Sequence, residues 1–287
     1  MILGVDGLRL LGNRSGVGRV LEALLEGLGE VRHPFDEIRV YTPEVLDDSR
    51  GLPAGARNVI VPSHLAPGLW QQISLPRAAR LDSVLLCPSY VAPVRPRCPT
   101  VLIHHGSYEG YPAAFPWFDR TKARILYAVS AHRATTVSTV SESSRRDMAR
   151  FYCLDPATIH VIPDGVDTRR FRRLDHPARL FRWREQVLGA DVPFLLHVGK
   201  PTRRRNLPAL LEAFAEMKQH DGIPHRLVFV GTDLARSPVA AVVERLGLVG
   251  EVHTIGFSSH EELVVAYNAA SLFVYPSSYE GFGMPVL

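Results

Sequence analysis

The chain has 287 residues, of which 46% are hydrophobic and 22% are charged, and its formal net charge is +4. This length favours two domains, and the composition is that of a soluble globular protein with ample core. A net charge of +4 is compatible with a phosphate-bearing ligand or an anionic membrane surface, but it is too small to indicate nucleic acid as a partner.

The chain contains three cysteines without metal-like spacing, which indicates a reduced, cytoplasmic protein. Asp6 and Arg9 interrupt the first apolar residues before a signal sequence could form. The long uncharged run 58–76 contains three prolines and is not a membrane span. We therefore expect any membrane contact to be peripheral, at the inner face of the membrane.

Short apolar runs alternate with segments of helical period along almost the whole chain, which predicts parallel sheets with helices on both faces. The predicted strands are Ile2–Val5, Ile38–Tyr41, Val59–Val61, Val84–Cys87, Val101–Ile103, Thr136–Val140, Ile159–Ile162, Phe194–Val198, Leu227–Val230, Val252–Ile255 and Leu272–Tyr275. The predicted helices are 21–28, Trp70–Arg80, Trp117–Ala134, Glu142–Phe151 with a Ser141 cap, a solvated helix within 169–184, 207–214, Val239–Leu246 and Glu261–Ala270.

The pattern of strands and helices restarts after an arginine-rich stretch that begins at Arg169. We therefore expect an N-terminal domain of residues 1–168 and a second domain of residues 169–287. Each half is an α/β, Rossmann-like, doubly wound domain, and the natural ligand site of such a pair is the cleft between them.

Two glycines, Gly16 and Gly18, lie between the first strand and its helix. Free backbone N–H groups and the helix dipole at such a place favour a phosphate. A dinucleotide fingerprint needs a third glycine where this chain has Leu21, so NAD is disfavoured. An ordinary turn explains the two glycines equally well.

A second loop, Lys200 to Arg205, holds four cations between the first strand of the second half and the next helix. Guanidinium groups match phosphate oxygens, and the helix N-terminus adds to the positive field, so this loop fits a diphosphate. A solvated basic turn is the competing interpretation, above all for Arg203.

Polar side chains end strands in both halves. His104 ends a strand and is followed by His105, and an imidazole there could bind a sugar hydroxyl or a leaving phosphate, or act as an acid or base. A structural histidine is the alternative, and no partner set indicates a metal site.

Glu280 lies in a glycine-rich loop, where a carboxylate can accept hydrogen bonds from hydroxyls or balance positive charge on a sugar ring. The alternative roles are a helix cap for Glu280 and a core plug for Phe282.

Taken together, these loops resemble the retaining glycosyltransferases of family 4, the "glycosyl transferases group 1" family, which have the GT-B fold of two Rossmann-like domains facing across a cleft. The similarity spans nearly the whole chain. It rests on the segments 15–19 (SGVGR), 103–104 (IH), 140–147 (VSESSRRD), 161–167 (VIPDGVD), 197–207 (HVGKPTRRRNL) and 280–287 (EGFGMPVL). The chain departs from the family pattern at His105 and Asp164, where the family usually has Asp and Asn.

The resemblance implies a donor-binding site. Arg204 and Arg205 match the family's diphosphate-binding Arg and Lys, and Glu280 is the first glutamate of its E-x7-E motif and contacts the donor sugar. His104 touches that sugar from the acceptor side. The other implied donor-binding residues are Gly16, Gly18, Lys200, Gly281, Phe282, Gly283 and Met284.

The resemblance also implies the activity: transfer of a sugar, mannose among the candidates, from a nucleotide-diphosphate sugar to a glycan or lipid-linked acceptor in bacterial glycan assembly, with no metal or other cofactor. The second motif glutamate would stand directly after Leu287, so we expect a protein cut within its donor domain, inactive alone and marginally stable. Two alternatives stay open: another GT-B enzyme such as an epimerase or phosphorylase, and a non-catalytic binding protein.

Overall fold

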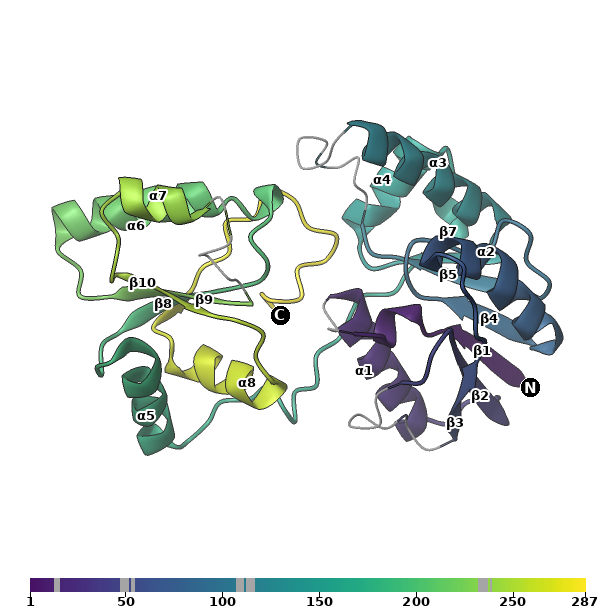
Figure 1. Cartoon of the computed structure of the whole chain (residues 1–287), viewed down its shortest axis with the longest axis horizontal. Helices are drawn as coiled ribbons and strands as arrows, with labels where there is room; N and C mark the ends of the chain where they lie inside the picture. The colour runs from purple at the N-terminus through teal and green to yellow at the C-terminus, as the bar shows by residue number, and fades with distance from the viewer. Residues whose placement is uncertain are drawn as a thin grey trace. The chain divides into compact units, whose positions relative to one another are not determined.

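The computed structural model describes residues 1–12, 16–46, 52, 55–106, 111, 117–231, 237 and 239–287. They form two compact units, Met1–Asp164 (unit 1) and Gly165–Leu287 (unit 2), shown in Figure 1. The sequence suggested a division a few residues further on, between residues 168 and 169. Each unit has its own parallel sheet and its own core, so each is described by itself.

Unit 1 is built on a seven-stranded sheet in the order β3-β2-β1-β4-β5-β6-β7. All of its neighbouring strands are parallel, which requires a crossover between each strand and the next. The strands are β1 (Ile2–Asp6), β2 (Glu37–Thr42), β3 (Ala56–Ile60), β4 (Val84–Cys87), β5 (Thr100–His104), β6 (Thr136–Thr139) and β7 (Ile159–Val161).

Helices cover both faces of this sheet, so its central strands are apolar on both sides. α1 (Val17–Glu30) packs Leu21 and Leu25 on one face. α2 (Pro67–Ala78), α3 (Trp117–Arg133) and α4 (Glu142–Tyr152) lie on the other face, as Figure 1 shows. Ser141 caps α4 by accepting a hydrogen bond from the Ser144 N–H at 3.1 Å, which confirms the predicted cap. Short 3-10 turns occupy Leu8–Leu10, Ala79–Leu81 and Pro156–Thr158.

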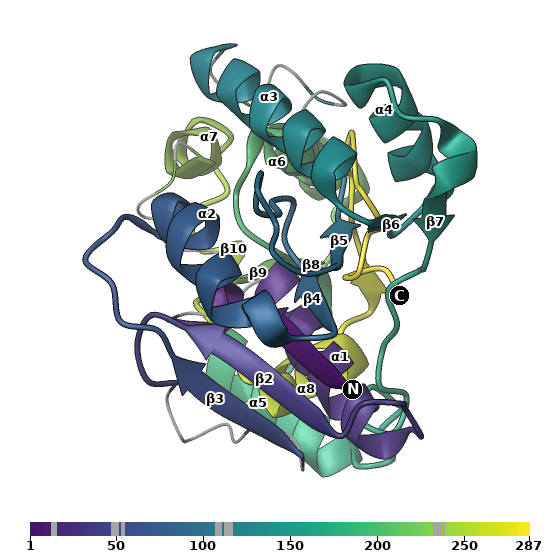
Figure 2. The same cartoon turned by 90° about the vertical axis from the view of Figure 1, so that its right-hand side faces the viewer.

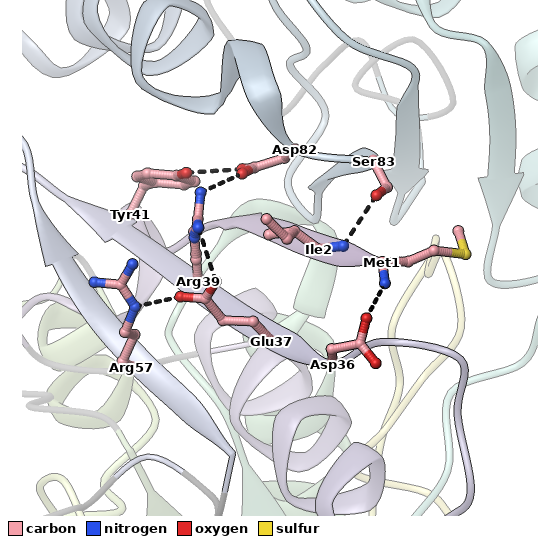
Figure 3. Close-up of polar contacts among 9 residues, drawn as sticks. All are labelled: Met1, Ile2, Asp36, Glu37, Arg39, Tyr41, Arg57, Asp82 and Ser83. Carbon is pink, nitrogen blue, oxygen red and sulfur yellow. Dashed lines mark hydrogen bonds and ion pairs between the residues drawn. The ribbon is translucent and has the colours of Figure 1, made fainter.

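A charged network lies at the amino-terminal edge of this sheet (Figure 3). The buried carboxylate of Asp82, just before β4, accepts hydrogen bonds from Arg39 Nη1 at 3.0 Å and from Tyr41 Oη at 2.7 Å, both on β2. Arg39 also pairs with Glu37 at 2.7 Å. Gly4 of β1 lies beside Arg39 in the ladder, and a Cβ there would collide with the Asp82 carboxylate. This network therefore joins three neighbouring strands and requires a glycine between them.

Unit 2 is built on a four-stranded parallel sheet in the order β10-β9-β8-β11. Its strands are β8 (Phe194–Val198), β9 (Arg226–Val230), β10 (Val252–Ile255) and β11 (Leu272–Phe273). Its helices are α5 (Pro177–Leu188), α6 (Leu207–Glu216), α7 (Val239–Arg245) and α8 (His260–Ala269), with a 3-10 turn at Arg203–Arg205 and a π turn at Met217–Asp221. Figure 1 shows α6 and α7 on one face of the sheet and α5 and α8 on the other.

The structure confirms the α/β, doubly wound fold class. Several element bounds differ from the prediction, and two of these differences have a clear local cause. The helix expected within 169–184 spans Pro177–Leu188, because Pro177 occupies its first turn, where proline's fixed φ and missing N–H do no harm. The last strand ends at Phe273 and not at Tyr275, since Pro276 cannot donate to a ladder. In the described part of the chain, none of the helices has the length and apolar character that a bilayer span requires.

Candidate active site

Two loops of unit 2 meet at the carboxyl-terminal edge of its sheet, where ligands bind in open α/β folds. One follows β8 and the other follows β11, and these strands are neighbours. The Arg204 carbonyl accepts hydrogen bonds from Ser278 N at 2.8 Å and Ser277 Oγ at 3.2 Å, and Arg204 Nη1 donates to the Tyr279 carbonyl at 3.0 Å. Hydrogen bonds to two backbone carbonyls, those of Arg204 and Tyr279, therefore hold the two loops together.

The carboxylate of Glu280 is the centre of this site. One oxygen forms an ion pair with Arg204 Nη1. The other lies 3.4 Å from Arg205 Nε and accepts hydrogen bonds from Ser277 Oγ at 2.7 Å and Tyr275 Oη at 3.0 Å. The structure thus brings together the three charged residues on which the sequence argument placed most weight, and it shows them in direct contact.

Arg205 is the more buried of the two arginines, with a side chain 12% exposed. Its Nη1 donates to the Val198 carbonyl at 3.2 Å, and its Cζ lies 4.6 Å from the centre of the Tyr275 ring. Burial lowers the pKa of Arg205 to about 10, and the charge of Glu280 opposes that shift. The guanidinium is therefore a cation at neutral pH.

Gly199 makes room for Arg205. It directly follows β8 with φ +138°, which side-chain-bearing residues rarely adopt, and a Cβ there would lie 2.6 Å from Arg205 Nη1. Sequence reasoning assigned no role to this glycine, or to Tyr275 and Ser277. The signal for the last two was their spacing: residues two apart in extended chain point to the same side, and both follow directly from β11.

His197 packs against Tyr275, one of the residues that contact Glu280. It is fully buried on β8 and stacks on Tyr275 with ring centres 5.5 Å apart, and its Nδ1 contacts the Val274 carbonyl at 3.0 Å. Burial lowers the pKa of His197 to about 4, so the ring is neutral at pH 7. It therefore fixes the Tyr275 ring without adding charge to the site.

The remaining predicted donor-binding residues of unit 2 belong to the same two loops. Lys200 is exposed in the loop after β8. The segment Gly281–Met284 follows Glu280 as a partly exposed turn, and Gly283 has φ +100°. The backbone there needs a glycine at residue 283. Contacts of these residues with a donor stay predictions.

His104 has a different environment from the one expected. Its side chain is fully buried among Tyr90, Tyr127 and Tyr152, with ring centres 5.0, 5.7 and 5.4 Å away, and its Nε2 lies 3.3 Å from Tyr152 Oη. Burial, with a smaller effect of His105, lowers the pKa of His104 to about 3. The ring is therefore neutral at pH 7 and presents no surface to a sugar in this structure, so its predicted contact gains no support from the geometry.

The glycine loop of unit 1 is described only in part, because residues 13–15 lie outside the described residues. Gly16 precedes α1 with φ +46°, and Gly18 is buried in the first helical turn. Both positions favour glycine for backbone and packing reasons. A bound phosphate at this helix start stays a prediction.

Among the described residues, no group of three or more His, Cys, Asp or Glu side chains could hold a metal ion. The residues that do gather, two arginines and a glutamate, suit a ligand with both phosphate and hydroxyl groups.

Comparisons with solved structures and with protein-family models both identify the chain as a glycosyltransferase. Sucrose-phosphate synthase from Thermosynechococcus elongatus superposes with a TM-score of 0.76 at 16% identity, over 99% of this chain and 77% of that one. Anabaena HepE, solved with UDP and glucose, gives 0.74 at 16% identity, over 99% and 76%. These likenesses establish the fold, which is that of the GT-B glycosyltransferases.

Residues 14–170 match the model "Glycosyltransferase Family 4" and residues 182–287 match "Glycosyl transferases group 1". The chain belongs to glycosyltransferase family 4.

Curated relatives of the chain are also glycosyltransferases. The MMP alpha-(1->4)-mannosyltransferase of Mycolicibacterium hassiacum is 30% identical over 61% of this chain and 41% of its own length. The O-antigen chain mannosyltransferase B of Escherichia coli is 29% identical over 72% of this chain and 54% of its own. The chain thus spans about half the length of the curated relatives it matches.

Proposed function

We propose that the protein containing this chain is a retaining glycosyltransferase that moves a sugar from a nucleotide-diphosphate sugar to a glycan or lipid-linked acceptor. The observation that carries the proposal is the contact of Glu280 with Arg204 and Arg205 at the carboxyl-terminal edge of the unit 2 sheet. Mannose is the sugar we favour, because relatives from two genera are named as mannosyltransferases. We assign the donor to unit 2 and the acceptor to unit 1.

In the donor complex, Arg204 and Arg205 would hold the diphosphate oxygens, and Glu280 would accept hydrogen bonds from the sugar hydroxyls. The arginines now bind the carboxylate that the phosphate would partly replace. Two guanidinium groups and one carboxylate leave one positive charge to complement the anionic diphosphate. Donor binding is therefore an exchange of partners within a preformed charged cluster.

Transfer with retention needs no side-chain base in this scheme. The bond from the anomeric carbon to the phosphate oxygen breaks, and the bond to the acceptor oxygen forms on the same face of the sugar. The acceptor proton moves to the leaving phosphate. Arg204 and Arg205 would stabilise the charge that develops on that phosphate. The neutral, buried His104 is not required for any step.

The proposal is tested first by binding. The full-length protein is screened by calorimetry and thermal shift against UDP-, GDP- and ADP-sugars, and we expect GDP-mannose to stabilise it most. A ligand at a hundredfold excess over its Kd adds about 2.7 kcal/mol to the free energy of unfolding. Stabilisation by none of these sugar nucleotides would contradict the proposal.

The second test is the product. Incubation with the stabilising donor and candidate acceptors should give a glycoside whose anomeric configuration, read by NMR, matches that of the donor. A product with inverted configuration would refute the retaining stereochemistry but not the transfer activity. Epimerisation of the donor without transfer would assign a different GT-B activity. We expect the 287-residue chain alone to show no turnover, because its matches to these relatives cover only 41% and 54% of their lengths.

A further inference from the structure

Tyr267 lies on α8, outside both loops of the candidate site, yet it bonds to the end of the second loop. Its Oη donates a hydrogen bond to the Pro285 carbonyl oxygen at 2.8 Å. Pro285 directly follows the segment Gly281–Met284, for which we predict contact with the donor sugar. Figure 1 and Figure 2 both show the yellow end of the chain close to α8. A third element of unit 2 therefore reaches the candidate site.

The peptide unit between Pro285 and Val286 is held on both sides. Proline has no N–H, so the carbonyl oxygen is the only backbone group of Pro285 that can form a hydrogen bond, and it accepts from Tyr267. The N–H of the same peptide unit belongs to Val286 and donates to the Gly283 carbonyl at 2.9 Å. Because a peptide unit is planar, the Tyr267 hydroxyl orients both of these groups and with them the turn from Gly283 to Val286.

The loop is thus held at each end. At its start, the Glu280 carboxylate is bound by the four side chains described above. At its end, the hydrogen bond from Tyr267 holds Pro285. The four residues between them, Gly281–Met284, include two glycines and are partly exposed. Glycine has the largest conformational freedom of any residue, so a second fixed end lowers the entropy cost of ordering this segment around a ligand.

The ring of Tyr267 is itself fixed by packing. Its centre lies 5.2 Å from that of Phe273 on β11 and 6.5 Å from that of Phe171, near the start of unit 2. Both neighbours pack with it against the core between the sheet and α8. The direction of the hydroxyl is therefore set by the fold of unit 2 before a donor arrives.

We propose that Tyr267 is a positioning residue for the donor sugar. Its hydroxyl acts through Pro285, and it orders Gly281–Met284 around the sugar without contacting the nucleotide. This role rests on the proposed function, because it requires the segment to meet the sugar of a nucleotide-diphosphate sugar. The hydrogen bond that holds the loop does not depend on that function, so the two can be tested separately.

Hydrogen exchange of the full-length protein tests the loop without any donor. Tyr267→Phe removes the hydroxyl and keeps the ring on Phe273, so the fold should be retained. The Val286 amide should exchange at least about fivefold faster in the variant, because the turn loses the hydrogen bond that orients its peptide unit. Amides of β8, which the substitution does not touch, should exchange at the wild-type rate.

Calorimetry with GDP-mannose and GDP tests the role in binding. Tyr267→Phe should raise the Kd of GDP-mannose by about five- to tenfold and leave that of GDP unchanged, since GDP lacks the sugar. Arg204→Ala with Arg205→Ala should weaken the binding of both compounds, because we place these side chains on the diphosphate. If the screen described above identifies another sugar nucleotide as the donor, that compound and its nucleoside diphosphate form the pair to compare.

Tyr41→Phe is the matched control. It also removes a phenol hydroxyl from a hydrogen bond, the one to Asp82 at 2.7 Å in unit 1. Both Tyr→Phe variants should lower the midpoint of thermal unfolding by no more than about 4 °C. Only Tyr267→Phe should change the ratio of the two Kd values, which a general loss of stability would not alter.

Three outcomes would overturn the role of Tyr267: an unchanged exchange rate at Val286, equal weakening of GDP-mannose and GDP, or the same change in the Kd ratio in Tyr41→Phe. A different result would count against the proposed function. If the wild type binds none of the screened sugar nucleotides while Val286 exchanges faster in Tyr267→Phe, the donor assignment fails and the hydrogen bond that holds the loop is confirmed.

Discussion

Two networks in this protein have nearly the same composition and opposite settings. Asp82, Arg39 and Tyr41 form one at the amino-terminal edge of the unit 1 sheet (Figure 3), and Glu280, Arg205 and Tyr275 belong to the other at the carboxyl-terminal edge of the unit 2 sheet. Each joins a carboxylate to a guanidinium and a phenol hydroxyl. The Asp82 side chain has no exposed surface, whereas that of Glu280 is 20% exposed.

The two networks differ in the secondary structure that carries their charged residues. Arg39 and Tyr41 are two residues apart on one rigid strand, so their positions are set by the sheet. Arg204, Arg205 and Glu280 lie on loops that follow strands, where the chain can adjust when a ligand arrives. The same three chemical groups therefore act as a structural clamp at one edge, and we propose that at the other edge they exchange partners with a ligand.

Removal of the Glu280 carboxylate tests the second half of this comparison and should have the largest effect. Glu280→Ala in the full-length protein should reduce transfer by about 10³-fold, because it deletes the group that we place on the donor sugar. The free energy of unfolding should fall by less than about 2 kcal/mol, since Arg204 keeps its hydrogen bond to the Tyr279 carbonyl. Steady-state kinetics and urea unfolding measure both, and near-normal transfer by the folded variant would refute the site.

Removal of the Asp82 carboxylate should show the reverse pattern. Asp82→Ala leaves Arg39 and Tyr41 without their buried partner, so the free energy of unfolding should fall by about 3 kcal/mol. Donor binding per folded molecule should be unchanged. Asp36→Ala, which breaks an exposed ion pair with the N-terminus, is the matched control and should leave stability unaltered. A selective loss of donor binding in Asp82→Ala would erase the distinction between the two networks.

Gly199→Ala probes the contact between backbone and site. The added Cβ would meet Arg205 Nη1 at 2.6 Å and would need φ near +138°, so we expect a loss of about 1–3 kcal/mol in stability. Displacement of Arg205 should also weaken donor binding. Gly165→Ala, where a Cβ meets open space, serves as the control. Equal behaviour of the two variants would show that Arg205 is not held as described.

Tyr275→Phe should have the smallest effect. It removes the hydroxyl bonded to Glu280 Oε1 but keeps the ring beneath Arg205, so kcat should fall by about tenfold, the value of one hydrogen bond to a charged group, with KM little changed. Tyr275→Leu also removes the ring and should raise KM as well. If Phe and Leu behave alike, the ring has no role in holding Arg205.

Much of the fold could be predicted because apolar runs in parallel sheets are nearly continuous. Val84–Cys87 and Phe194–Val198 were placed to the residue. The start of α5 was harder, since arginines both precede the helix and lie within it, and only Pro177 marks its first turn.

The charged residues of the site could be predicted from the sequence, but the residues that hold them in place could not. Glu280 and the arginines share loops after strands, which the sequence shows directly. The roles of Gly199 and Tyr275 depend on where a single side chain, Arg205, comes to lie, and that is a tertiary fact. The burial of His104 was likewise beyond reach, because the tyrosines that enclose it come from three separate segments.

The order of strands in unit 2 has a consequence for how the site is made during synthesis. Among the strands that the structure describes in residues 165–287, β8 is the first to leave the ribosome and its neighbour β11 is the last. Arg204 therefore emerges 75 residues before Tyr279, its eventual partner, and the cationic turn at Arg203–Arg205 stays solvated until the chain through Glu280 follows. We therefore expect closure of the sheet edge and neutralisation of the arginines to occur together, after the chain through Glu280 has been made.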